Sequence, residues 1–239
     1  MEIITTRVNK SIVLSEYTDG IRFGTDALLL ADFVNGRGKC LDLGAGSGII
    51  GLLLLASKKA NSVDGVEIQK QYVSLAAQNA LSNGFCEQYN AVERDITHIG
   101  EFEAGVYDYC VSNPPYLKAG SGFDNLSEAL NIARREILCT VDSVCAAASK
   151  SVKSGGNVYM VYRADRLDSL LFSLKKHSLQ PKRLRVICPS AEKKPSLVLV
   201  DAKKDAAEGM VFENVFYIYK DNLHTEYSDE MKKIYSDFS

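Results

Sequence analysis

Four consecutive residues, Asn113, Pro114, Pro115 and Tyr116, are the positions best suited to chemistry. Each proline lacks an N–H and disfavours a helical conformation of its predecessor, so this segment is expected to be stiff and rich in hydrogen-bond acceptors. The side-chain oxygen of Asn113 and the carbonyl of Pro114 are two acceptors, which suit an NH2 group. Tyr116 offers a face on which a flat ring would stack, worth about 1–3 kcal/mol. The alternative is a strand-ending turn with a surface tyrosine.

A glycine-rich segment earlier in the chain is suited to binding a ligand. Residues 41–48 read Leu-Asp-Leu-Gly-Ala-Gly-Ser-Gly. Glycines let the backbone turn sharply and approach a ligand closely, and the helix that follows offers free N–H groups. Ile49 stands where the dinucleotide fingerprint requires its third glycine, and the Lys-Ser/Thr pair of a Walker motif is missing. A pyrophosphate ligand is therefore disfavoured.

Two acidic residues lie farther along, each near the end of an expected strand. Glu67 is placed to accept two hydrogen bonds from a ribose diol. Asp95 is placed to accept from the amino group of an adenine. Together with the glycines, these acids predict a nucleoside pocket without a phosphate site. The alternative is a glycine turn that serves only tight packing, with incidental acids at strand ends.

The elements that must position these residues alternate between strand and helix. Such alternation predicts an α/β fold with a mainly parallel sheet and helices on both faces, and ligands bind at the carboxyl ends of its strands. The helix over residues 69–83 is expected to bury Val73, Ala76, Ala77 and Ala80. Strands are expected at residues 40–43, 62–67, 88–92, 106–112, 157–162, 184–188, 196–202 and 211–219, and helices at 49–57, 69–83, 166–177 and after Ser127, with Ala129, Ile132, Ala133, Ile137, Val141 and Val144 on one stripe.

Composition favours one domain of 239 residues, 46% hydrophobic and 24% charged, with a net charge of −2. Neither a secretory leader nor a membrane-spanning run is recognisable, so a cytoplasmic protein is expected. The six scattered cysteines are expected to be core thiols, and no spacing predicts a metal site. Duplex DNA is not an expected partner. Residues 150–194 nevertheless carry a net charge of +8, which predicts either an RNA-binding surface or ordinary solvated faces. The candidate RNA-binding residues are Lys118, Lys175, Lys176, Lys182, Arg183 and Arg185.

The combination of Asp-x-Gly-x-Gly-Ser-Gly, the later Val-Glu-Ile acid and Asn-Pro-Pro-Tyr resembles the class I S-adenosylmethionine methyltransferases over about residues 20–200. The resemblance implies a Rossmann-like, seven-stranded, mostly parallel sheet and S-adenosyl-L-methionine as the cofactor. It implies that Asn113, Pro114, Pro115 and Tyr116 catalyse methylation of a planar nitrogen: adenine N6, guanine N2 or a glutamine amide. The implied cofactor-binding residues are Thr25, Asp26, Asp42, Gly44, Ala45, Gly46, Ser47, Gly48, Glu67, Ile68, Asp95, Ile96 and Asn113.

Three further segments are similar to the bacterial tRNA(Val) adenosine-37 N6-methyltransferases: Gly-Thr-Asp-Ala-Leu-Leu-Leu at 24–30, Ala-Arg-Arg-Glu at 133–136, and Tyr-Ser-Asp-Glu at 227–230 followed by Tyr235 and Phe238. Arg135 and the pair at 206–207 depart from that family, in which His and two glycines are common. The similarity implies tRNA as the partner, with residues 1–35 covering the cofactor and 203–239 as a C-terminal addition.

Three alternatives stay open. One is a release-factor glutamine methyltransferase, which is disfavoured because residues 1–40 lack the pattern of the helical domain that those enzymes carry there. The others are a methyltransferase of ribosomal guanine N2 and an RNA-binding protein that keeps the cofactor pocket without turnover. Thr25 and Asp26 are also good helix N-capping residues, a role that would be compatible with a cofactor contact.

Overall fold

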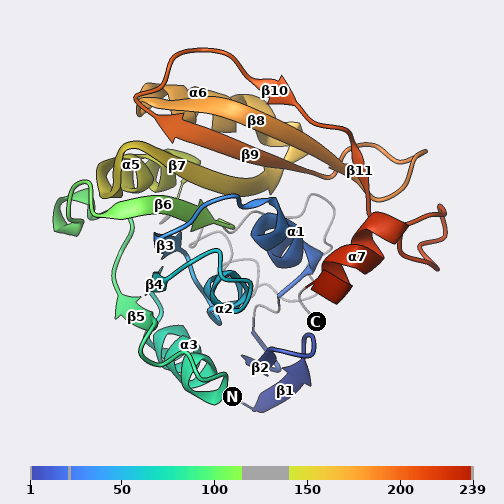
Figure 1. Cartoon of the computed structure of the whole chain (residues 1–239), viewed down its shortest axis with the longest axis horizontal. Helices are drawn as coiled ribbons and strands as arrows, with labels where there is room; N and C mark the ends of the chain where they lie inside the picture. Colours follow the sequence, from blue (N-terminus) through green and yellow to red (C-terminus); the bar gives the residue numbers. More distant parts are fainter. Residues whose placement is uncertain (1, 21–22, 115–139, 238–239) are drawn as a thin grey trace.

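The computed structural model describes residues 2–20, 23–114 and 140–237. Its centre is a mixed sheet in the order β8-β9-β7-β6-β3-β4-β5, in which β9 alone runs antiparallel to its neighbours (Figure 1). These seven strands confirm the expected Rossmann-like fold. They are β3 (Lys39–Leu43), β4 (Ser62–Glu67), β5 (Tyr89–Glu93), β6 (Tyr107–Ser112), β7 (Val152–Arg163), β8 (Leu179–Cys188) and β9 (Leu197–Lys204).

Helices cover both faces of the sheet and bury two apolar clusters. One cluster gathers apolar side chains of α1, α2, α3 and α7, and the other those of α5 and α6 (Figure 1). Both faces of the sheet are therefore covered by helices, as a largely parallel sheet requires. The helices are α1 (Thr25–Phe33), α2 (Ile49–Ala56), α3 (Lys70–Ser82), α5 (Val141–Ser151), α6 (Leu167–Lys176) and α7 (Asp229–Asp237), with short 3-10 turns η1 (Ile99–Glu101) and η2 (Ala164–Arg166).

Two details of the expected elements are wrong. The strand expected over residues 211–219 is two short strands, β10 (Val211–Phe212) and β11 (Phe216–Tyr217), which both pair with β8 in parallel. Helix α3 buries Tyr72, Leu75, Ala76, Asn79 and Ala80, whereas Val73 is half-buried and Ala77 is exposed. The buried face of α3 is rotated relative to the predicted face because α3 packs against an N-terminal hairpin as well as the sheet. The helix expected from Ser127 is described only from Val141, with Thr140 as its N-cap.

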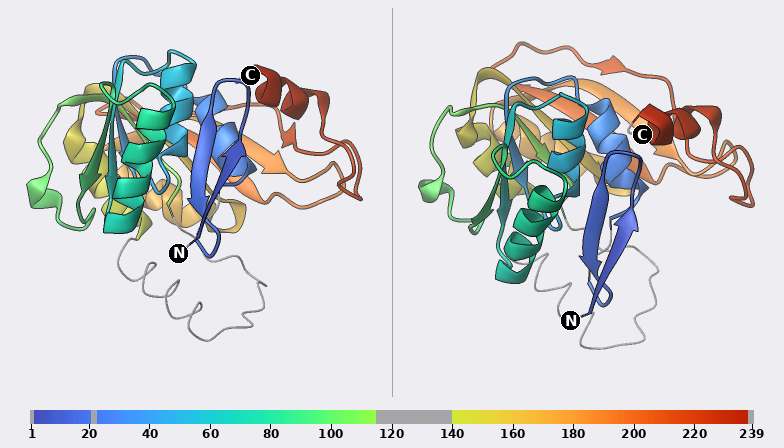
Figure 2. Two further views of the ribbon diagram at one scale, coloured as in Figure 1. Left: turned by 90° about the horizontal axis from the view of Figure 1, so that it is seen from below. Right: turned by 60° about the horizontal axis from the view of Figure 1, so that its bottom comes forward.

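The N-terminal hairpin consists of β1 (Ile3–Arg7) and β2 (Val13–Tyr17) and lies apart from the main sheet, near α3 (Figure 2). Two asparagines, one in α3 and one at its C-cap, attach it by pairing with the backbone of β2. Asn83 bonds both the N–H and the carbonyl of Val13, at 2.8 and 2.7 Å. Asn79 does the same at Ser15, at 2.9 and 3.0 Å. The sequence reasoning did not foresee this hairpin.

Within the described ranges, every helix is too short or too polar to span a bilayer. Four cysteines confirm the expectation of core thiols, since Cys40, Cys110, Cys145 and Cys188 are buried and free. Among the described cysteines, Cys86 is the exception, because it is exposed, and Cys139 lies outside the described residues.

Candidate active site

The carboxyl ends of three neighbouring strands bring the predicted site residues together. Leu43, the last residue of β3, is opposite Val66 of β4 on one side and Ser112 of β6 on the other. The Ser112 hydroxyl donates to the Leu43 carbonyl at 2.8 Å, which holds the ends of these two strands together. Neighbouring strands lie about 4.8 Å apart. This end of the sheet therefore places the glycine-rich segment beside both Glu67 and Asn113.

The glycine-rich segment forms a tight loop between β3 and α2. Gly44, Gly46 and Gly48 have φ angles of 78°, 55° and 83°, a left-handed conformation that favours glycine. A Cβ atom at Gly44 or Gly46 would meet no other described atom within 4 Å. Backbone conformation, and not crowding, demands these two glycines, and the space beside them is available to a ligand.

Tyr89 supports this loop from the protein interior. An added Cβ would lie 2.9 Å from the Tyr89 hydroxyl at Gly48, 2.6 Å from its ring at Gly51 and 2.1 Å from its hydroxyl at Gly65. Three glycines therefore make room for one buried tyrosine. The sequence reasoning missed Tyr89, because its position in the strand gives no sign that its ring reaches the loop.

Asn79 is a second residue that the sequence reasoning missed. In addition to holding the hairpin, its amide donates to the carbonyl of Ser47 at 2.9 Å. One buried side chain thus connects β2, α3 and the glycine-rich loop. The sequence does carry one sign of this residue: Asn79 is polar and directly precedes Ala80, which is predicted to be buried.

Glu67 is fixed at the end of β4 by backbone donors. One carboxylate oxygen accepts from the N–H of Gly46 at 3.2 Å, and the other accepts from the N–H of Gln69 at 2.9 Å. A carboxylate oxygen accepts more than one hydrogen bond, so both remain suited to a ribose diol. Ile68, the next residue, exposes 44% of its surface, as an apolar contact for a ligand would require.

Asp95 lies near Glu67, because the N–H of Arg94 donates to the Glu67 carbonyl at 3.1 Å. Its side chain accepts from the N–H and hydroxyl of Thr97 at 2.8 and 2.7 Å. Desolvation raises the pKa of Asp95, but the Thr97 hydrogen bonds and the nearby His98 outweigh it, so the pKa lies below its ordinary value. The adjacent Ile96 is buried. Asp95 is thus an ordered acceptor near Glu67, and its contact with an adenine amino group stays a prediction.

Asp42 is an acid buried beneath the glycine-rich loop. Its Oδ2 accepts from the N–H of Gly51 at 3.3 Å, and its Oδ1 has no partner among the described residues. Desolvation raises the pKa of Asp42 to about 7, despite the opposing effect of the Gly51 hydrogen bond. This unpaired oxygen, the open side of the loop and the acceptors of Glu67 and Asp95 fit a cationic nucleoside such as S-adenosylmethionine.

Asn113 meets α1 directly beyond the end of β6. Its side-chain NH2 donates to Oδ2 of Asp26 at 2.9 Å. Gly24 is the N-cap of α1, so Thr25 and Asp26 are the first two helical residues and the N-capping alternative is wrong for both. Pro114 is buried next to Asn113. Pro115, Tyr116 and Lys118 lie outside the described residues.

The candidate RNA-binding arginines are engaged in ion pairs within the chain. Arg183 contacts Asp201 at 3.0 Å and Glu213 at 2.8 Å. Arg185 lies 2.6 Å from the other oxygen of Glu213, in an ion pair without hydrogen-bond geometry. These pairs hold the segment around β10 against β8 and β9.

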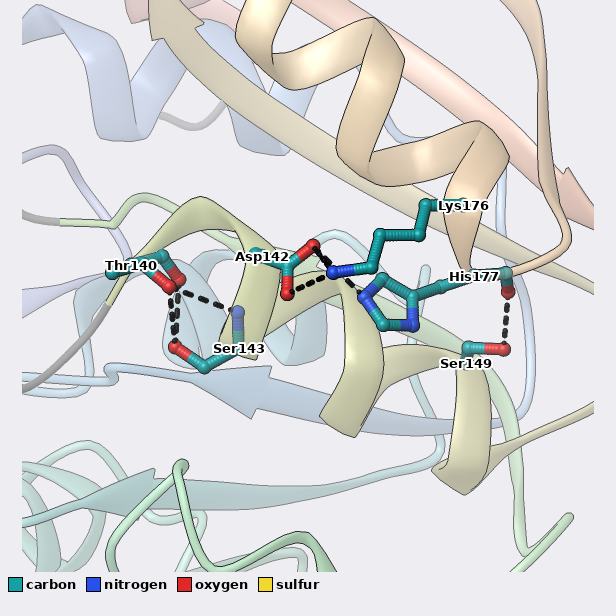
Figure 3. Close-up of polar contacts among 6 residues, drawn as sticks. All are labelled: Thr140, Asp142, Ser143, Ser149, Lys176 and His177. Carbon is teal, nitrogen blue, oxygen red and sulfur yellow. Dashed lines mark hydrogen bonds and ion pairs between the residues drawn. The ribbon is translucent and has the colours of Figure 1, made fainter.

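The described candidate lysines, Lys175, Lys176 and Lys182, lie away from the loop and Asn113. Lys175 and Lys176 end α6, beside the amino end of β8, whereas the site lies at the carboxyl ends. Lys175 lies 3.6 Å from Glu208, and Lys182 donates to the carbonyl of Ala207 at 3.3 Å. Lys176 pairs with Asp142 at 2.9 Å, where His177 also contacts the carboxylate (Figure 3). Their role in RNA binding stays a prediction.

Comparisons with known proteins identify the family of this chain. Residues 16–171 match the family described as the methyltransferase small domain. A protein of Aeromonas hydrophila is 30% identical over 184 residues, covering 75% of each chain, and one of Histophilus somni is 28% identical over 221 residues, covering 91% of this chain and 90% of that protein. Both are named tRNA1(Val) (adenine(37)-N6)-methyltransferase.

Solved structures share the fold. A crystal structure of a predicted O-methyltransferase from Agrobacterium tumefaciens has a TM-score of 0.72 at 18% identity, covering 90% of this chain and 97% of that one. The extent of the family match and the similarity to the Aeromonas protein establish that this chain belongs to the methyltransferase small-domain family and is an S-adenosylmethionine-dependent methyltransferase.

Proposed function

We propose that this enzyme methylates N6 of an adenine in RNA, and that its substrate is adenosine 37 of tRNA(Val). The observation that carries the proposal is the orientation of Asn113. Its NH2 donates to Asp26, so the side-chain oxygen is the atom available to accept from a substrate amine. The names of the Aeromonas and Histophilus relatives support tRNA as the substrate class.

Adenine N6 needs help as a nucleophile because its lone pair is delocalised into the ring. S-adenosylmethionine supplies a methyl carbon made electrophilic by its sulfonium. The oxygen of Asn113 and the carbonyl of Pro114 would accept the two N–H bonds, which favours the pyramidal nitrogen of the transition state. The bound cofactor would supply its methyl group to the N6 lone pair and keep the electron pair of the C–S bond, and one N6 proton would leave to solvent.

The chain itself offers contacts for the rest of the cofactor. Glu67 would bind the ribose diol, Asp95 the adenine amino group and Ile68 the face of that adenine.

An anticodon-loop base is already unpaired, so its presentation to the active site costs less free energy than flipping a base from a duplex. Residues 1–35 would cover the cofactor, a role supported by the link that Asn79 makes between the hairpin and the loop.

The test is methyl transfer from labelled cofactor to defined substrates. The purified chain is incubated with tRNA(Val), with tRNA(Val) carrying guanosine at position 37, with release factor and with ribosomal RNA. We expect N6-methyladenosine, identified by nucleoside mass spectrometry, in the first substrate and not in the second. Labelling of release factor or ribosomal RNA alone would refute the tRNA assignment, and cofactor binding without labelling of any substrate would favour a non-catalytic protein.

A further inference from the structure

The contact between Asn113 and Asp26 fixes the orientation of an amide that is otherwise nearly symmetric in shape. The two oxygens of Asp26 have separate partners: Oδ2 accepts from the Asn113 NH2 at 2.9 Å, and Oδ1 accepts from the N–H of Ala27 at 3.0 Å. Carboxylate oxygens accept and do not donate. The NH2 of Asn113 must therefore face Asp26, and its oxygen must face the other way.

Helix α1, which carries Asp26, is anchored at its carboxyl end. The ammonium of Lys59 donates to the carbonyls of Ala31 and Asp32 at 2.8 and 2.7 Å. Arg183 donates to the carbonyl of Phe33 at 2.9 Å. The last carbonyls of a helix lack partners within it, so these two cations complete its hydrogen bonding. Most of α1 is also buried, and Asp26 is thereby presented to Asn113 on a rigid element.

We infer that Asp26 is a positioning residue for methyl transfer, whose carboxylate holds the Asn113 amide with its oxygen toward the substrate amine. The inference rests on the proposed function, in which that amine is adenine N6. Without Asp26, the Asn113 amide would rotate and present its NH2 to the substrate amine, so that two hydrogen-bond donors would face each other. This assignment differs from the cofactor contact that the sequence predicts for Asp26.

The geometry predicts that asparagine does not replace Asp26, although its shape is nearly the same. An asparagine has one acceptor, whereas Asp26 uses two. If its oxygen accepts from Ala27, its NH2 faces Asn113, whose amide must then rotate to offer its oxygen. A reciprocal exchange restores the pattern: with Asp26→Asn and Asn113→Asp together, the amide at position 26 donates to one oxygen of the new carboxylate. The second carboxylate oxygen then faces the substrate.

The experiment measures single-turnover methyl transfer to tRNA(Val) at saturating cofactor. We expect Asp26→Asn and Asp26→Ala to slow transfer by about 10²-fold, comparable to the loss of one hydrogen-bonding group that acts in a transition state. Cofactor affinity should change less than about twofold, and the double exchange should recover part of the loss of Asp26→Asn. Asp142→Asn is the matched control, because Asp142 is likewise the second residue of its helix and does not contact Asn113.

A second readout separates this inference from the choice of substrate. In protein labelled with 15N, the side-chain NH2 of Asn113, assigned by its loss in Asn113→Ala, should exchange with solvent faster in Asp26→Ala than in the wild type. Unmethylated tRNA(Val) with this change in exchange would refute the proposed substrate and keep the positioning role. Unchanged exchange, or cofactor affinity that falls as much as the transfer rate, would overturn the role of Asp26.

Discussion

At the residue scale, the acids of the site differ because their surroundings differ. Glu67 accepts from two backbone N–H groups, whereas Asp42 is fully buried with one donor. Burial without compensating donors disfavours the charged form of an acid. Asp42 therefore titrates near neutral pH, with a pKa of about 7, even though the family resemblance implies the same cofactor-binding role for both residues.

This shift predicts a pH-dependent stability. The pKa of Asp42 is higher in the folded chain than in the unfolded chain, so its contribution to the free energy of unfolding is fully present below pH 4 and is lost as the pH rises through about 7. The asparagine side chain of the Asp42→Asn variant cannot ionise. Urea titrations should show the variant gaining stability relative to the wild type between pH 5 and pH 8, by on the order of 1 kcal/mol or more. A difference that stays constant over this range would contradict the assignment.

At the element scale, the hairpin and the glycine-rich loop are coupled through α3. Asn79 and Asn83 hold β2 in the same way, but only Asn79 also bonds the loop, at the carbonyl of Ser47. The pair therefore separates attachment of the hairpin from support of the cofactor site.

We expect Asn79→Ala and Asn83→Ala each to lower the free energy of unfolding by about 1–3 kcal/mol, because each leaves backbone groups of β2 without partners. Only Asn79→Ala should also weaken S-adenosylmethionine binding, by severalfold in calorimetry. Equal effects of the two variants on cofactor affinity would show that the hairpin, and not the bond to Ser47, supports the loop.

At the scale of the whole molecule, the lysines and arginines of residues 150–194 are divided between the two sides of the sheet at which the strands begin and end. Leu197, the first residue of β9, is opposite Arg163 and Ile187, so residues 189–196 lie at the edge that holds Asn113. This connection carries the exposed Lys193 and Lys194. Lys175 and Lys176 lie beside the other edge, at the amino end of β8.

A comparison of two charge reversals tests which edge meets RNA. Because phosphate contacts give salt-dependent affinity, we expect Lys193→Glu with Lys194→Glu to raise the KM for tRNA about tenfold and to weaken its salt dependence. The matched change of Lys175 and Lys176 should have a smaller effect. The reverse order would support the surface predicted from the sequence, and equal effects would indicate long-range attraction without defined contacts.

The sequence alone determined the order of strands and helices from β3 to β9, the glycine-rich loop and the position of Asn113 after a strand, because these follow from local patterns of apolar residues, glycine and proline. Only the tertiary structure decided which distant side chains meet. Asp26 and Asn113 are 87 positions apart, and Asn79 and Ser15 are 64 apart. Arg183 looked like a surface cation, but β9 and the segment after β10 supply its acids. Such contacts depend on how the sheet orders its strands and where α1 and the hairpin pack, which no local pattern encodes.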